Sequence, residues 1–155
     1  KELLKFSKIK VKGLDRDKTV NIIAKKLENK FPNRFKFHQI KFSELDTVSN
    51  DLVDTVIFDL GLSSIQLNNF ERGFSFKSSK NLDMSMGLSQ ISAQDAINNL
   101  SEVNLKLIIK ILGEEKEASR IAKNIIKFRR EKKITKVTEL VKIIEKSKKK
   151  IMQLK

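Results

Sequence analysis

The sequence predicts an α/β fold in which part of a Rossmann-like parallel sheet is followed by an all-helical segment. Two observations support this prediction. Short apolar strands alternate with a helical pattern in the first sixty residues, and the periodicity is helical throughout after about residue 90. We therefore expect a sheet-containing part over residues 1–80 and a helical part over residues 81–155.

The elements of the first part follow from apolar runs and chain breakers. Strands are expected over 9–14, 35–40 and 54–59, with a helix over 18–30. Pro32 and Asn33 break the chain between the helix and the second strand. The order strand, helix, strand, connection, strand indicates a parallel sheet.

The second part carries helix signals only. After a polar loop over 66–90, helices are expected over 92–100, 101–112, 114–130 and from the residue after Thr135. Ser92 and Asp95 have capping-box spacing, Ser101 can cap the following helix, and Gly113 can end it. Only the tail over 147–155 (SKKKIMQLK) is expected to fray.

The charge of the chain is strongly positive and unevenly distributed. The net charge is +14, and residues 101–155 hold 17 Lys and Arg against 7 Asp and Glu. This distribution favours a polyanionic partner of the helical part, although the composition of an AT-rich genome would also enrich lysine. The chain has no cysteine, and it shows neither a signal-peptide pattern nor an apolar run long enough to span a membrane. We expect a soluble cytoplasmic protein that needs no metal and no membrane.

Asp15 ends the first expected strand within a Leu-Asp-Arg-Asp sequence. In nucleotide-binding α/β units an acid at this place accepts hydrogen bonds from ribose hydroxyls, but a polar residue that merely closes a strand fits equally well. The glycine turn of such units lies about twenty residues before the acid, which is outside this sequence. Either Asp15 is not such an acid, or the chain begins after its cofactor loop.

The most specific pattern lies between residues 54 and 86. Asp59 opens the sequence DLGLSSIQL, and RGFSF follows at 72–76. These linked motifs resemble the bacterial 16S ribosomal RNA (cytosine-N4)-methyltransferases, in which D-L-G-x-S-S-x-Q-L and R-G-F-S-F run together. The resemblance spans nearly the whole chain. It implies S-adenosylmethionine as cofactor, 16S ribosomal RNA of the small subunit as partner, and a helical insertion that recognises RNA. Relatives have a Gly-Gly-His or Gly-Gly-Tyr turn before this segment and further strands after it, so the resemblance implies an internal piece.

The resemblance also assigns residues to the cofactor. It implies that Asp15 binds the ribose, that Phe42 lies beside the adenine, and that Asp59 and Gln66 make the remaining contacts. From the residues alone, Phe42 fits an ordinary core phenylalanine and Asp59 fits a turn acid. Asp59 is also the candidate acceptor at the cytosine amine, where an acceptor would draw off developing positive charge. Amino-methyltransferases usually carry [DNS]-P-P-aromatic at this place, whereas this chain has Asp-Leu-Gly-Leu.

The loop after this motif offers candidate RNA contacts. Arg72 can pair with a phosphate, and Phe74 can stack on an extruded base. The alternative is that this loop docks against the helical part. Relatives often read G-P-L-D-M-R-M where residues 80–86 read KNLDMSM, so one arginine and one proline of the family pattern are missing.

The helix expected over 114–130 has two contrasting faces. Its apolar stripe consists of Ala118, Ile121, Ala122, Ile125 and Ile126. Its opposite face carries Arg120, Lys123, Lys127 and Arg130. These basic residues are RNA-phosphate candidates, and the alternative is a solvated charged face.

The expected function is methylation of the N4 amine of a cytidine in 16S ribosomal RNA, with the 155-residue piece alone inactive. The alternative is a non-catalytic basic RNA-binding protein derived or truncated from such an enzyme.

Overall fold

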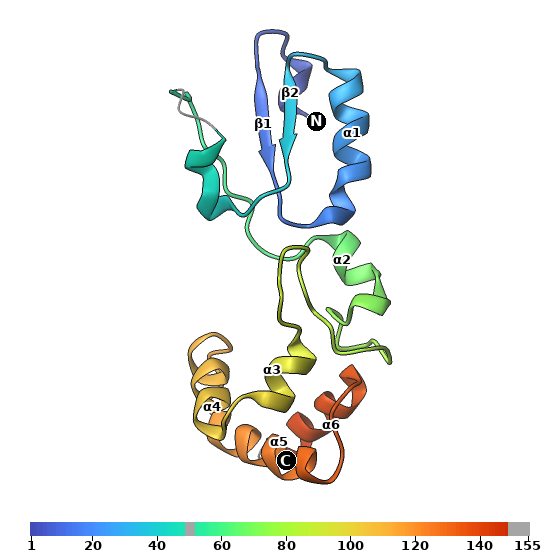
Figure 1. Ribbon diagram of the computed structural model, residues 1–155, viewed down its shortest axis with the longest axis vertical. Helices are drawn as coiled ribbons and strands as arrows, with labels where there is room; N and C mark the ends of the chain where they lie inside the picture. Colours follow the sequence, from blue (N-terminus) through green and yellow to red (C-terminus); the bar gives the residue numbers. More distant parts are fainter. Residues whose placement is uncertain (49–51, 149–155) are drawn as a thin grey trace, which may run out of the picture. The chain divides into compact units, whose positions relative to one another are not determined.

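The computed structural model describes residues 1–48 and 52–148, which fold as two compact units (Figure 1). The first unit contains Lys1–Asp59 and Met86–Ser89. The second contains Leu60–Ser85 and Gln90–Lys155. The part of the expected fraying tail over 149–155 lies outside the described residues.

The first unit is built on a small parallel sheet. Its elements are η1 (Leu3–Lys5), β1 (Val11–Leu14), η2 (Lys18–Val20), α1 (Asn21–Lys30), β2 (Phe35–His38) and η3 (Phe42–Thr47). The two strands pair in parallel from Val11 opposite Phe35 to Leu14 opposite His38, and α1 packs along them (Figure 1). The predicted strand–helix–strand order of residues 9–40 is therefore confirmed, and the chain has a mixed α/β fold.

The third predicted strand, over 54–59, does not form. Among the described residues the sheet contains only β1 and β2, and residues 54–59 are irregular and exposed. The apolar residues of this segment lie in solvent: Val56 is 50% exposed, Ile57 69% and Phe58 59%. A strand exists only when a neighbouring strand satisfies its backbone N–H and C=O groups. The apolar pattern of this segment indicated a strand but could not supply that neighbour.

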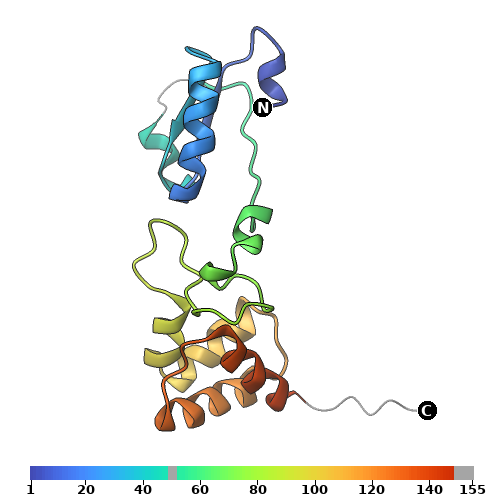
Figure 2. The same cartoon turned by 90° about the vertical axis from the view of Figure 1, so that its right-hand side faces the viewer.

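The second unit is helical. Its elements are α2 (Ser64–Asn68), η4 (Phe70–Arg72), α3 (Ala93–Asn99), α4 (Glu102–Ile111), α5 (Ala118–Glu131) and α6 (Val137–Ser147). Helices α3 to α6 are gathered together in both ribbon views (Figures 1 and 2). The predicted cap of α3 is confirmed, because the Ser92 hydroxyl accepts a hydrogen bond from the backbone N–H of Asp95 at 3.1 Å. The Ser101 hydroxyl likewise accepts from the N–H of Asn104 at 3.2 Å and caps α4.

The start of one helix differs from the prediction, and one short helix was not predicted. Helix α5 begins at Ala118 rather than at residue 114, because Glu114 adopts a left-handed conformation (φ 49°) that a right-handed helix cannot contain. Helix α2 lies where a loop was expected to begin. Its sequence signal was available, since Ser63 and Gln66 have the spacing of a capping box.

A continuous core holds the helical unit together. Its buried members are Leu82, Leu105, Ile121, Ala122, Ile125, Ile134, Val137 and Ile143. Three of these belong to the apolar stripe predicted for α5, and Ala118 of the same stripe is 2% exposed. The predicted buried face of α5 is therefore confirmed.

Polar side chains brace the turn between α5 and α6. The side-chain amide of Asn98 donates to the Ile134 carbonyl at 2.7 Å and accepts from the Ile134 N–H at 3.0 Å. The Glu139 carboxylate accepts from the N–H groups of Thr135 and Lys136 and from the Lys132 ammonium, at 2.9, 3.1 and 2.8 Å. The Lys132 ammonium and these backbone hydrogen bonds lower the pKa of Glu139 to about 2.

Candidate functional site

Asp15 lies at the carboxyl edge of the parallel pair, where ligands of α/β sheets bind. It follows the last residue of β1, and its backbone N–H donates to the His38 carbonyl at the end of β2, at 3.3 Å. Its Oδ1 accepts from the Asp17 N–H at 2.8 Å, which fixes the half-buried carboxylate in a tight turn. Carboxylate oxygens accept hydrogen bonds, so a side chain fixed at this edge suits a ligand that presents hydroxyl donors.

Phe42 and the residue before Asp59 meet in the first unit. Phe42 opens η3 after β2, is 60% exposed, and forms an edge-to-face contact with Phe58 at a centroid distance of 6.1 Å. Asp59 directly follows the residue that contacts Phe42. It is not at the end of a strand. An exposed aromatic ring beside this edge is available to lie against a planar ligand.

Gln66 is buried inside the second unit. It is 6% exposed and lies in α2, where its Oε1 accepts from the Ser63 N–H at 2.9 Å. Its own N–H donates to the Ser63 hydroxyl at 3.3 Å. These contacts form the capping box that begins α2 at Ser63.

The RGFSF loop is pinned by its arginine. Arg72 Nη2 donates to the Ser85 carbonyl at 2.8 Å, and the Arg72 carbonyl accepts from the Met84 N–H at 2.9 Å. The guanidinium also lies over the ring of Phe74, 5.0 Å from its centroid. Arg72 and Phe74 are thus brought together, and each contributes to the packing of this loop.

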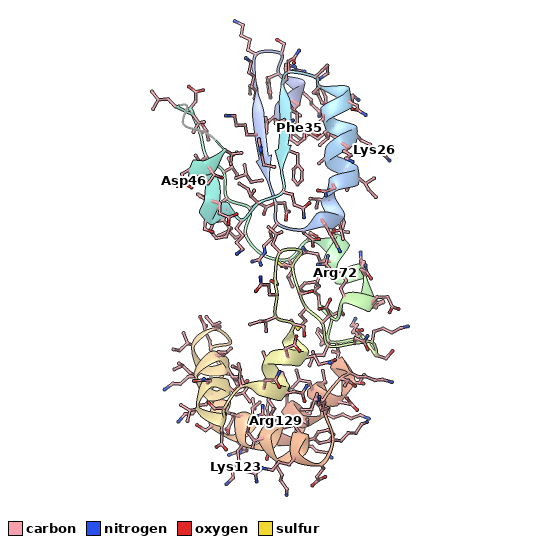
Figure 3. All side chains as sticks on the ribbon, viewed as in Figure 1. Lys26, Phe35, Asp46, Arg72, Lys123 and Arg129 are labelled. Atoms are coloured by element: carbon pink, nitrogen blue, oxygen red, sulfur yellow. The ribbon has the colours of Figure 1, made fainter. Side chains whose placement is uncertain are left out.

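The four basic residues on the outer face of α5 fall into two groups. Arg120 is engaged with protein atoms, since its Nη1 lies 3.1 Å from Glu117 Oε2 and donates to the Ser147 carbonyl at 3.0 Å. Lys123, Lys127 and Arg130 are exposed, and Figure 3 shows Lys123 pointing away from the helices. The exposed basic face of α5 is therefore narrower than the sequence suggested.

Two structural arginines were not identified from the sequence. Arg129 (Figure 3) donates to the Ile97 and Leu100 carbonyls at 2.6 and 2.7 Å and so closes the carboxyl end of α3. Arg16 donates to Met86 and Ser89, some seventy residues away. The partners of these two arginines could not be predicted from neighbouring residues. The position of Arg16 between two acids in Leu-Asp-Arg-Asp was the one local signal of a structural role.

Within residues 1–48 and 52–148, His, Asp and Glu side chains form no group of three that could hold a metal ion. Over the same ranges, every helix is too short or too polar to cross a membrane.

The first unit thus carries an acid at the carboxyl edge of a parallel strand pair, and the second carries exposed basic residues on α5. A family model described as the MraW methylase family matches residues 1–155. The chain belongs to this family.

Similar proteins carry a consistent name. The chain is 44% identical over 135 residues to "Ribosomal RNA small subunit methyltransferase H" of Bartonella bacilliformis, which covers 87% of this chain and 41% of that protein. It is 41% identical over 149 residues to the protein of the same name from Ehrlichia canis, covering 93% of this chain and 50% of that protein. The Sulfurihydrogenibium protein is 40% identical over 141 residues. The chain thus spans about half the length of the curated relatives it matches.

Proposed function

We propose that the protein containing this chain transfers a methyl group from S-adenosylmethionine to the N4 amine of a cytidine in 16S ribosomal RNA of the small subunit. The observation that carries this proposal is the Asp15 carboxylate, fixed by the Asp17 N–H at the carboxyl edge of a parallel strand pair in a chain of the methylase family. In this proposal β1, α1 and β2 are part of a Rossmann-like cofactor domain over residues 1–80, and residues 81–155 form a helical insertion.

Each candidate residue has its own role toward the cofactor or the cytidine in this proposal. Asp15 accepts hydrogen bonds from the ribose hydroxyls, Phe42 lies against the adenine, and Gln66 makes a further contact with the cofactor. When bound, S-adenosylmethionine supplies a methyl group on a sulfonium leaving group. Asp59 contacts the cofactor and accepts a hydrogen bond from the cytosine amine, which stabilises positive charge on that nitrogen. Because the leaving group is already good, alignment supplies much of the rate.

The helical unit provides the RNA contacts in this proposal. Lys123, Lys127 and Arg130 are exposed on one face of α5 and bind phosphates. Arg72 and Phe74 contribute a phosphate contact and a stacking surface for the extruded base, and their contact with each other helps to hold their loop in place. The target cytidine must leave its stack for its amine to reach the methyl group.

Cofactor binding is tested by removing the Asp15 carboxylate in the full-length protein. Asp15→Ala should weaken S-adenosylmethionine binding by about 1.5–3 kcal/mol, typical for charged hydrogen bonds. Asp46→Ala removes the same charge from an exposed position of the same unit (Figure 3) and should leave the affinity unchanged. Isothermal titration calorimetry that finds equal affinities for the two variants would exclude Asp15 from the site.

The role of Asp59 is tested by turnover rather than by binding. Asp59→Asn keeps the size of the side chain but weakens it as an acceptor, so methyl transfer at saturating cofactor should fall more than RNA affinity does. The measurement is methyl incorporation into small ribosomal subunits beside an RNA-binding titration. Normal turnover would show that Asp59 is not an essential acceptor.

RNA binding is tested through its salt dependence. The triple variant Lys123→Gln, Lys127→Gln, Arg130→Gln should weaken RNA binding and reduce the slope of log K against log salt by about 2, at roughly 0.7 per lost phosphate contact. The control variant Lys8→Gln, Lys25→Gln, Lys26→Gln removes three exposed charges from the first unit. Equal slopes for both variants would refute a specific role for α5.

A further inference from the structure

Arg16 connects two segments that are distant in the sequence. Its Nε donates to the Met86 carbonyl at 3.1 Å, and its Nη2 donates to the Ser89 hydroxyl at 2.8 Å. Arg16 is half-buried, as are both of its partners. Hydrogen bonds from a charged guanidinium are among the stronger ones, and the planar fork also fixes the direction of the side chain.

Gly87 brings the same two segments into backbone contact. It has a left-handed conformation (φ 48°), and a Cβ at this position would lie 2.0 Å from the Arg16 carbonyl oxygen. Any larger residue would therefore force the segments apart. The Met86–Ser89 segment is held by the backbone of Arg16 as well as by its side chain.

The Arg16 backbone is itself held in a rigid turn. Asp15 Oδ1 accepts from the Asp17 N–H on one side of Arg16. On the other side, Asp17 is 1% exposed and caps η2 by accepting from the N–H and the hydroxyl of Thr19, at 3.0 and 2.9 Å. A displacement of Arg16 would consequently be transmitted to the Asp15 carboxylate.

We propose that Arg16 and Gly87 form a clasp that positions the Asp15 carboxylate for the ribose, so that Arg16 is a positioning residue of the cofactor site. This inference rests on the proposed function, because it assumes that Asp15 binds S-adenosylmethionine. We expect the clasp to affect the affinity for S-adenosylmethionine. We expect no effect on the methyl-transfer step itself, because Arg16 is directed at Met86 and Ser89 and not at the reacting atoms.

The test compares matched variants of the full-length protein. Arg16→Ala should weaken S-adenosylmethionine binding about tenfold, while methyl transfer at saturating cofactor stays within about twofold. Arg34→Ala is the control. Arg34 donates to the carbonyls of Leu4, Phe6 and Ser7 in the same unit and lies just before the start of β2, whereas Asp15 follows the end of β1. Its loss should destabilise the fold to a similar degree and leave cofactor affinity within about twofold.

Two further variants keep the test decisive if Arg16→Ala does not fold. Ser89→Ala removes one acceptor of Arg16 and should weaken cofactor binding about threefold. Arg16→Lys should bind the cofactor more tightly than Arg16→Ala and less tightly than the parent, because lysine keeps the charge but not the planar guanidinium. Folded variants with unchanged affinity, or equal losses in the Arg34→Ala control, would overturn the clasp. A parent protein that neither binds S-adenosylmethionine nor transfers methyl groups would instead refute the proposed function.

Discussion

The two units of this chain differ in how many apolar side chains they bury. Of the buried apolar residues in the described structure, the first unit contributes only Leu4 and Ala24, and all the others belong to the second. In the first unit, Val56, Ile57 and Phe58 are each at least half exposed. In the second, the buried apolar side chains form one core, although α4 also exposes Val103, Leu107 and Ile111.

This difference follows from what each secondary structure needs. A helix satisfies its own backbone and has only to find a surface for one apolar stripe, which neighbouring helices supply. A strand needs neighbours both for its backbone and for its faces. The helical unit therefore has its own core, whereas the 54–59 segment keeps the apolar pattern of a strand without a sheet around it.

The largest expected effect lies in the helical core. Ile125 is 1% exposed, so Ile125→Ala should lower the free energy of unfolding by about 2–5 kcal/mol, the range for large-to-small core substitutions. Urea denaturation followed by helical circular dichroism measures this. Ile111→Ala, at a position 61% exposed on α4, is the control and should change it by less than about 0.5 kcal/mol. Equal effects would show that the core described for this unit is not the one that stabilises it.

The next effect concerns Glu139, which braces the start of α6. Its pKa is lowered from 4.5 to about 2, so its contribution to stability is present above about pH 4.5 and is lost as the pH falls towards 2. Glu139→Gln should cost about 1–3 kcal/mol at pH 7 and flatten the stability profile between these pH values. The exposed Glu145→Gln is the control and should keep the profile of the parent. A parent with flat stability from pH 5 to 2 would contradict the prediction.

A smaller effect is expected at the amino end of α3. Ser92→Ala removes the hydroxyl that accepts from the Asp95 N–H and donates to its carboxylate at 2.6 Å, and it should cost about 1 kcal/mol. The same hydroxyl is the main cause of the lowered pKa of Asp95, so that pKa should rise in the variant. Thermal denaturation and carboxyl titration by NMR measure the two changes. Ser119→Ala on the exposed side of α5 should change neither.

Local chemistry made much of the fold predictable. The caps at Ser92 and Ser101, the apolar stripe of α5 and the strand–helix–strand order before residue 40 all depend on residues a few positions apart, and all are present. The start of α5 was missed because the left-handed turn at Glu114 has no strong local signal.

The candidate site was less predictable because its geometry depends on distant partners. The acid after β1 could be identified, but the hydrogen bonds of the neighbouring Arg16 to Met86 and Ser89 bridge about seventy residues. Arg120 looked like part of a free basic face, whereas it pairs with Glu117 three residues earlier and also donates to the Ser147 carbonyl, whose position depends on how α6 packs. Sequence patterns indicate which chemistry is available, and tertiary contacts decide which groups remain exposed.

The smallest expected effect tests the exposed segment of the first unit. Ile57 is 69% exposed and lies outside the sheet, so Ile57→Thr should change the free energy of unfolding of the 155-residue chain by less than about 0.5 kcal/mol. In a buried strand the same loss of apolar contact would cost well over 1 kcal/mol. Phe37 of β2 supplies the comparison, because it is half-buried and paired opposite Gly13, and Phe37→Ala should be clearly destabilising. Urea denaturation of both variants decides the matter: a large effect at residue 57 would mean that this segment is packed in solution and that the contrast between the two units is smaller than the structure indicates.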